Sequence, residues 1–278
     1  MEKIDRLGWT DGISFSAFGV RLGIRLNDGS LLDRIRTFIP PGSKPANSPV
    51  VDHLYSLMTG RETRAKVRRF NLLYSGAGRL ARTLDLEEAL AALESDLGLY
   101  IAEFARQRLF VHAGVVGWQG KAIVIPGRSF SGKSTLVAAL LRAGAVYYSD
   151  EYAVFDSLGR VHPFPRPLSL RSKGDCSVAH VPSESFGSSA GIKPLPVALV
   201  VGSDYAPNAK WRPRTLSLGQ GVLLLLNNTV AARNRPKAAL ATLRRVVSDA
   251  KIIRSKRPEA EKTAELLLQA MLATGRPE

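Results

Sequence analysis

Residues 127–135 read Gly-Arg-Ser-Phe-Ser-Gly-Lys-Ser-Thr and match the phosphate-binding pattern G-x-x-x-x-G-K-[ST]. The pattern constrains the fold, because a loop of this kind joins a buried strand to a helix. Residues 122–125 are apolar and mostly β-branched, which predicts the strand. Apolar residues recur at helical spacing over 136–141, and Gly144 follows where a glycine ends many helices. Strand, loop and helix therefore follow one another in the required order.

Such a loop binds phosphate because its backbone N–H groups converge at the positive end of the following helix. Lys133 is expected to reach the β- and γ-phosphates, and the Ser134 hydroxyl to bind Mg²⁺. The residues expected to contact the nucleotide are Gly127, Arg128, Ser129, Phe130, Ser131, Gly132, Lys133, Ser134 and Thr135. We expect ATP and Mg²⁺ as the cofactors. An ordinary glycine turn would not explain why loop, lysine, hydroxyl and flanking elements agree.

Two adjacent acids follow the next strand-like run, residues 145–149. In phosphate-loop proteins an acid at the end of a neighbouring strand holds Mg²⁺, and a base accepts the proton of the attacking hydroxyl. Asp150 and Glu151 suit these roles, with Asp150 beside Ser134 as the second metal ligand. Successive strand residues point to opposite faces, so both acids serve one site only if the chain turns at Ser149 or Glu151. The alternative is a solvated acidic turn.

Residues 110–135, followed by 148–151, resemble the catalytic core of the HPr kinase/phosphorylase family. That family has a histidine before the first strand, then the phosphate loop, then an Asp-Asp pair closing the next strand. Here His112 stands 21 residues before Lys133, and Glu151 stands 18 residues after it. The resemblance covers about residues 108–171. It implies a P-loop fold with a mixed sheet, and a kinase that transfers the γ-phosphoryl group of ATP to a serine hydroxyl. The catalytic residues it implies are His112, Lys133, Asp150 and Glu151.

The chain departs from the family at two places. Glu151 stands where the family has aspartate as the expected base, and the extra methylene moves the carboxylate by roughly an ångström. Residues 165–171 are basic and lack an acid, whereas the bifunctional enzymes have a glutamate in this segment. We therefore expect a kinase without the phosphorylase reaction. The chain looks more like stand-alone relatives, some of which accompany lasso peptide biosynthesis and phosphorylate a serine of a precursor peptide.

His112 has two interpretations. A lone histidine entering an apolar strand is more often a core residue than a catalyst, but its spacing to Lys133 favours the catalyst. Its expected role is to pair with the acids or with the transferring phosphoryl group, because imidazole changes charge near neutral pH. The other three histidines form no recognisable arrangement. Cys176 is the only cysteine, which excludes an intramolecular disulfide and a multi-cysteine metal site.

Two other functions compete with the kinase. Residues 216–220 resemble the signature loop of transporter ATPases, but the apolar run that follows, 222–226, ends in two asparagines instead of Asp-Glu. The second competitor is a nucleotide-dependent regulatory protein that hydrolyses ATP slowly and binds an acidic partner or nucleic acid. The histidine and the acids favour the kinase, because a switch needs no base.

The chain of 278 residues, 45% of them hydrophobic, predicts an α/β protein of two domains. The first, 1–107, reads as a smaller α+β domain, and the second, 108–278, as the catalytic P-loop domain. Within the first domain we expect strands at 20–26, 51–57 and 66–74, and helices at 31–39 and 86–107. Asp85 and Glu88 are spaced as a capping box for the longer helix.

After the acids, residues 151–155 and 159–164 predict a hairpin. The stretch 172–196 is rich in Ser, Gly and Pro and is expected to be a mobile lid or substrate flap. A strand at 196–201 and helices from about 235 and over 258–272 complete the domain.

The net charge of +15 is concentrated late in the chain, where residues 204–257 hold twelve Lys/Arg and two acids. Such a surface would attract an acidic peptide or protein substrate, nucleic acid or an anionic membrane, and a solvated basic face without a specific partner is the alternative. Nucleic acid is less favoured, since Trp211 is the only tryptophan there and no nucleic-acid-binding module is visible. Arg233 and Arg235 are candidates for a clamp on the γ-phosphate. We expect a cytoplasmic protein, because no apolar run approaches the roughly 20 residues of a membrane span and no signal peptide is visible. The oligomeric state stays open, with a homo-oligomer as one option.

Overall fold

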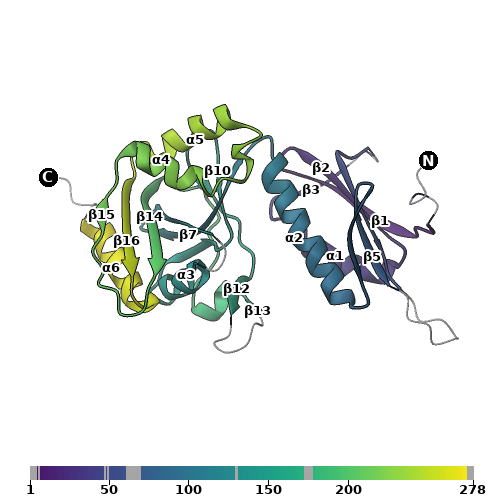
Figure 1. The fold of residues 1–278 in the computed structure, drawn as a ribbon, viewed down its shortest axis with the longest axis horizontal. Coiled ribbons are helices and arrows are strands. Elements are labelled where there is room, and N and C mark those ends of the chain that lie inside the picture. The colour runs from purple at the N-terminus through teal and green to yellow at the C-terminus, as the bar shows by residue number, and fades with distance from the viewer. Residues whose placement is uncertain are drawn as a thin grey trace. The chain divides into compact units, whose positions relative to one another are not determined.

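The structure is a computed structural model and describes residues 5, 7–46, 48, 50–60, 70–128, 131–171 and 178–273. The chain divides into two compact units, Met1–Gln107 and Arg108–Glu278. Each unit combines helices with a sheet that holds both parallel and antiparallel strand pairs (Figure 1). None of the described helices is both long and apolar enough to cross a membrane.

The first unit is a six-stranded sheet of order β3-β1-β2-β4-β5-β6, with one long helix packed on β5 and β6. Among its described strands, β2 and β4 pair in parallel and the other neighbours are antiparallel. Its elements are β1 (Asp11–Ala17), β2 (Val20–Leu26), a 3₁₀ turn (Gly29–Leu31), α1 (Leu32–Thr37), β3 (Lys44–Pro45), β4 (His53–Met58), β5 (Asn71–Ser75), β6 (Gly78–Thr83) and α2 (Leu86–Phe104).

The second unit is built on a sheet of order β11-β10-β7-β8-β14-β16-β15, with β9 paired to β7 beside β10. Its first elements are β7 (Leu109–Trp118), β8 (Lys121–Pro126), α3 (Lys133–Arg142), β9 (Val146–Ser149), β10 (Tyr152–Phe155), β11 (Val161–His162), β12 (Leu168–Arg171) and β13 (Val178–Val181). The others are a 3₁₀ turn (Ser183–Phe186), β14 (Val197–Tyr205), β15 (Arg214–Thr215), α4 (Leu218–Leu226), a 3₁₀ turn (Val230–Ala232), α5 (Pro236–Ser248), β16 (Lys251–Arg257) and α6 (Ala260–Ala273).

Alternate residues of the central strands enter two separate cores, one on each face of this sheet. Ile123 and Ile125 of β8 pack with α3 and α6, whereas Ala122 and Val124 pack with α4 and α5. Burial on both faces explains why β8 reads as a continuous apolar run instead of an alternating one. Figure 1 shows the two helix pairs on opposite sides of the sheet. The phosphate loop leaves this sheet at the end of β8.

Several elements differ from their prediction. Residues 222–226, an apolar run to which no element was assigned from the sequence, belong to helix α4, and Ser217 and Gln220 form a capping box at its start. Asp85 caps α2, but Glu88 accepts a hydrogen bond from the Thr83 side chain, so no capping box forms there.

The expected lid, 172–196, includes strand β13, which pairs with β12, and the 3₁₀ turn Ser183–Phe186. Residues 172–177 lie outside the described residues, as do residues 66–69 of the strand expected at 66–74, which begins in the structure at Asn71.

Candidate functional site

The phosphate loop ends at Gly132, which begins α3 in the left-handed conformation, with φ of 78°. No side chain caps the helix and its first turn holds no acid, so the positive end of α3 is open to an anion. Lys133 is only 7% exposed, and its Nζ donates a hydrogen bond of 2.7 Å to the carbonyl of Arg128. Ser129 and Phe130 lie outside the described residues. The ammonium group thus folds back into its own loop, where a phosphate would compete for it.

Burial lowers the pKa of Lys133 to about 8, although the carboxylates of Asp150 and Glu151 oppose this shift. A second buried polar group lies nearby, since Oγ of Ser131 has no hydrogen-bond partner within the described part of the chain. A Cβ at Gly127 would stand 2.8 Å from this oxygen, so a larger residue there would require the Ser131 side chain to move. The loop thus holds a buried ammonium group and a hydroxyl without a hydrogen-bond partner. A bound phosphate would supply negative charge to the first and an acceptor to the second.

Asp150 is 6% exposed and accepts three hydrogen bonds. The hydroxyl of Ser134 donates to Oδ2 at 2.9 Å, and the backbone N–H of Ser169 donates to the same oxygen at 3.0 Å. The phenol of Tyr147 shares its one proton between Oδ1 at 3.1 Å and the carbonyl of Arg166 at 2.6 Å. Burial, together with the Asp150 charge, raises the pKa of Tyr147, so the phenol stays protonated and able to donate. These contacts fix the carboxylate beside the first turn of α3.

The two acids sit where strand β7 passes from pairing with β9 to pairing with β10. A bulge in β9 lies between the residues paired with Val115 and Val116, and the chain bends at Asp150 and Glu151. The chain therefore turns where the sequence requires it, and bulges of this kind re-aim side chains beside functional sites. Glu151 is half-buried, and its backbone carbonyl accepts from the N–H of Ala113 at 3.1 Å. The Glu151 carboxylate also contacts the phenol of Tyr152, whose pKa is raised by burial and then by this charge.

His112 lies on β7 directly opposite Tyr152, with ring centroids 5.9 Å apart. Its backbone carbonyl accepts from the N–H of Gly127 at 3.3 Å, which ties the start of the phosphate loop to this strand. Burial, and then the charge of Lys133, lowers the pKa of His112 to about 4. In the ligand-free protein the imidazole is therefore neutral near pH 7. The expectation that His112 changes charge near neutral pH is therefore wrong for the ligand-free protein, because its pKa lies well below 7.

Arg257, the last residue of β16, contacts the loop from the far end of the sequence. It is 2% exposed, and its Nη2 donates to the carbonyl of Gly132 at 2.9 Å and to that of Ser131 at 3.4 Å. Burial lowers the pKa of Arg257. In a trans peptide the C=O and the next N–H point in opposite directions. By holding these two carbonyls, the guanidinium directs the N–H groups of Gly132 and Lys133 away from itself and toward the open side of the loop.

A magnesium ion would find suitable ligands at Ser134 and Asp150. Neighbouring ligands of an octahedral ion at 2.0–2.1 Å lie about 2.9 Å apart, which is the spacing of Ser134 Oγ and Asp150 Oδ2. Mg²⁺ is usually held by one or two carboxylates together with substrate phosphates, so a larger protein cage is not required. The described residues contain no group of three or more His, Cys, Asp or Glu able to hold a metal.

The structure thus gathers His112, Lys133, Ser134, Asp150 and Glu151 around the phosphate loop. Arg233 and Arg235 lie instead at the start of α5. The basic segment 165–171 adjoins Asp150, because the N–H of Ser169 contacts its carboxylate. Sequence reasoning missed three contributors: Tyr147, Ser169 and Arg257. Tyr147 stands three residues before Asp150 and offered a local signal, whereas the other two depend on the fold.

Comparison with protein-family models finds no match, and comparison with curated proteins finds none. Among solved structures the chain is similar to the HPr(Ser) kinase/phosphatase from Coxiella burnetii, at 14% identity and a TM-score of 0.35. The likeness covers 60% of this chain and 99% of the other. It is too weak to carry an assignment of activity, substrate or site residues.

Proposed function

We propose that this protein is an ATP-dependent phosphotransferase that moves the γ-phosphoryl group of ATP onto the hydroxyl of a serine in a peptide or small protein. The observation that carries the proposal is the contact between Ser134 and Asp150. It places a hydroxyl and a carboxylate with the spacing of metal ligands at the start of a helix whose loop ends in a buried lysine.

The chain's own groups divide the work. The N–H groups of the loop and the Lys133 ammonium hold the β- and γ-phosphates, and Ser134 and Asp150 hold the metal. Magnesium, when bound, neutralises charge on the phosphate oxygens. With its carboxylate already accepting three hydrogen bonds, Asp150 is poorly placed to take a proton. Glu151 is the less buried acid and is the proposed base.

In the transfer step the acceptor oxygen bonds to the γ-phosphorus while the bond from that phosphorus to the β–γ bridging oxygen breaks. The hydroxyl proton passes to the Glu151 carboxylate, and the products are a phosphoserine and ADP. Neutral His112, beside Lys133, donates or accepts a hydrogen bond to the phosphoryl group or the acceptor. We expect little of the reverse phosphorolysis, because the segment beside Asp150 contains Arg166 and Arg171 and no acid.

The test is incubation of the protein with ATP, Mg²⁺ and peptides encoded beside its gene, followed by mass spectrometry. A serine gaining one phosphoryl group, with no gain when Lys133→Met replaces the wild type, supports the proposal. ATP hydrolysis that no peptide accelerates and that leaves every peptide unmodified would point instead to a nucleotide-dependent switch.

A further inference from the structure

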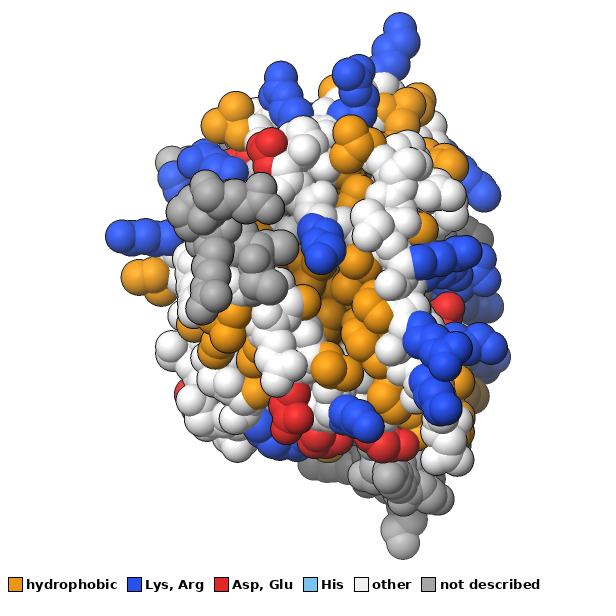
Figure 2. Space-filling model, turned by 90° about the vertical axis from the view of Figure 1, so that its left-hand side faces the viewer, with side chains coloured by type: hydrophobic (Ala, Val, Ile, Leu, Met, Phe, Trp, Pro, Cys, Tyr) orange, Lys and Arg blue, Asp and Glu red, His pale blue; other side chains and the backbone are white. Residues whose placement is uncertain are grey.

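A second concave site lies at the edge of the catalytic sheet, in the unit formed by residues 108–278. This edge hollow has a volume of about 500 Å³ and lies between the chain that follows β14 and the junction of β16 with α6. It is lined by Asn208, Ala209, Lys210, Trp211, Pro258, Glu259, Lys262 and Leu266. Figure 2 views the molecule from the side of β15 and α6, where hydrophobic side chains lie among Lys and Arg, with Asp and Glu along the lower edge.

The position of the edge hollow follows from the sheet. Strands β8, β14 and β16 are neighbours and run parallel, so their carboxyl ends meet at one edge. The phosphate loop follows β8, and the two segments that form the hollow follow β14 and β16. In open α/β sheets, ligands bind outside the carboxyl ends of such strands. Two strand spacings separate β8 from β16, about 10 Å, a span that the ribose and α-phosphate of a nucleotide can bridge.

Direct contacts join the edge hollow to the phosphate loop. Arg257 donates to the carbonyl of Gly132 on the loop side and, from Nη1, to the carbonyl of Pro258 in the wall of the hollow at 3.4 Å. The guanidinium lies 5.3 Å from the ring of Tyr205, whose phenol donates to Oε1 of Glu259 at 2.7 Å. One buried cation therefore supports both places.

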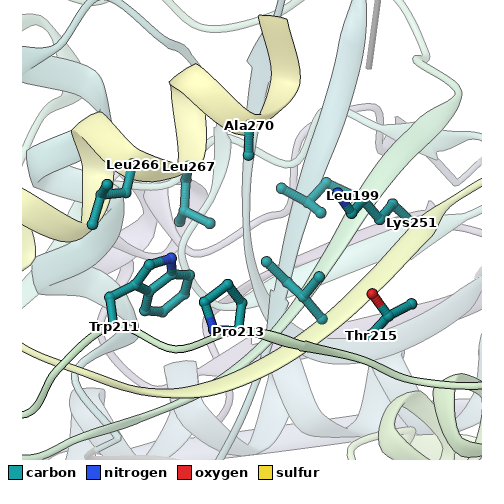
Figure 3. Close-up of a pocket in the computed structure, with 9 residues that line it drawn as sticks. Leu199, Trp211, Pro213, Thr215, Lys251, Leu266, Leu267 and Ala270 are labelled. Carbon is teal, nitrogen blue, oxygen red and sulfur yellow. The ribbon is translucent and has the colours of Figure 1, made fainter. Parts of the chain in front are cut away.

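The lining suits a flat, partly polar ligand. Trp211 and Leu266 supply an aromatic and an apolar surface, while Asn208, Glu259 and Lys262 supply groups that can bond to ring nitrogens or sugar hydroxyls. Trp211 and Leu266 also line a smaller apolar cavity of about 100 Å³ between α6 and the sheet (Figure 3). That cavity is below the roughly 300–1,000 Å³ of ordinary ligand pockets, whereas the edge hollow is within this range.

We propose that the edge hollow binds the base and ribose of the nucleotide whose phosphates occupy the loop. The inference rests on the proposed function, and it assigns the nucleoside part of ATP to residues 208–211 and 258–266.

The test fills the hollow and compares two ligands. Ala209→Trp adds a large side chain inside it, and Ala241→Trp on the exposed surface of α5 is the matched control. We expect Ala209→Trp to raise the Kd for ATP at least tenfold while the Kd for inorganic tripolyphosphate stays within twofold. The control should change neither. Unchanged ATP affinity, or equal weakening of both ligands, would overturn the inference and leave the phosphate site standing. A wild type that binds neither ligand would contradict the proposed function itself.

A second measurement does not depend on how the variant folds. Irradiation of the wild type with 8-azido-ATP should label a peptide from 208–211 or 258–266, and excess ATP should protect it. Protected labelling confined to any other part of the chain would place the base elsewhere and overturn the inference.

Discussion

The hydroxyl of Ser134 and the backbone N–H of Ser169 donate to the same oxygen, Oδ2 of Asp150, at 2.9 and 3.0 Å. The first turn of α3, the end of β9 and the start of β12 therefore meet at one carboxylate. The proposed metal ligands are held in place before any ligand binds.

Asp150 and Glu151 should fail in different ways when changed. Asp150→Asn replaces a buried acceptor of three hydrogen bonds, so we expect a loss of about 1–3 kcal/mol in stability and a higher Mg²⁺ requirement. Glu151→Gln should keep nucleotide affinity and lower the transfer rate by about 10²–10⁴-fold. Calorimetric ATP titration with Mg²⁺, together with phosphoryl transfer rates, separates the two. If both variants lose ATP binding equally, the acids are both metal ligands.

Lys133→Met should abolish Mg·ATP binding without unfolding the protein. Because burial holds the pKa of Lys133 near 8, the charged ammonium costs stability in the ligand-free state, and the substitution should leave the unfolding temperature equal or higher. Differential scanning fluorimetry with and without ATP checks both parts. A variant that still shows the full thermal shift with ATP contradicts the role of the lysine.

Arg257→Met should loosen the phosphate loop, since the carbonyls of Ser131 and Gly132 lose their donor. The matched control is Arg254→Met on the same strand, whose guanidinium is half-exposed and pairs with Asp204 at 3.5 Å. We expect faster hydrogen exchange in a peptide covering 131–136 and at least tenfold weaker ATP binding for Arg257→Met only. Equal hydrogen-exchange rates in the two variants would show that Arg257 does not hold the loop in place.

His112 should titrate far below an ordinary histidine. The folded protein takes this proton near pH 4, while the unfolded chain takes it near 6.5, so the unfolded state gains relative stability as pH falls across this interval. Removing the group with His112→Gln should recover up to about 3 kcal/mol of the stability lost between pH 6.5 and 4. NMR titration of the imidazole signals, assigned by their absence in the variant, measures the pKa. A midpoint near 6.5 would show that the ring is solvated.

The basic stretch 204–257 should draw an acidic acceptor, which we place near the β12–β13 hairpin. Screening acts over roughly 10 Å at 0.1 M salt, so acceptor binding should weaken with added salt while ATP binding in the loop changes much less. Steady-state rates at rising salt, with the KM for each substrate, test this. If the KM for the acceptor does not change with salt concentration, charge attraction is not how the acceptor is recognised.

Short sequence patterns predicted the core of the site, but no sequence pattern predicted the contacts between residues far apart in the chain. The loop, the helix α3 and the strand before the acids are each coded within a few neighbouring residues. Arg257 stands 125 residues from the carbonyl it contacts, in a strand whose basic residues read as a solvated stretch. The parallel pairings of β8 with β14 and of β14 with β16 bring it to the loop.

Helix α4 was missed for a different reason. Its five consecutive apolar residues have no helical period, and a short apolar run does not distinguish strand from helix. The cap at Ser217 and Gln220 was the available local signal. For α2 the same pattern misled, because Glu88 contacts Thr83 instead of closing the box.

Strand β7 pairs with Ser149 at Val115 and with Tyr152 at His112, so two residues lie between the paired positions on each side. Pairing with β7 on both sides therefore fixes the length of the segment that carries the two acids. Deleting or adding a single residue between 149 and 152 would slide β10 by one position and turn Phe155 out of its core. Substitutions that keep two residues between 149 and 152 should therefore disturb the fold less than a single deletion or insertion there.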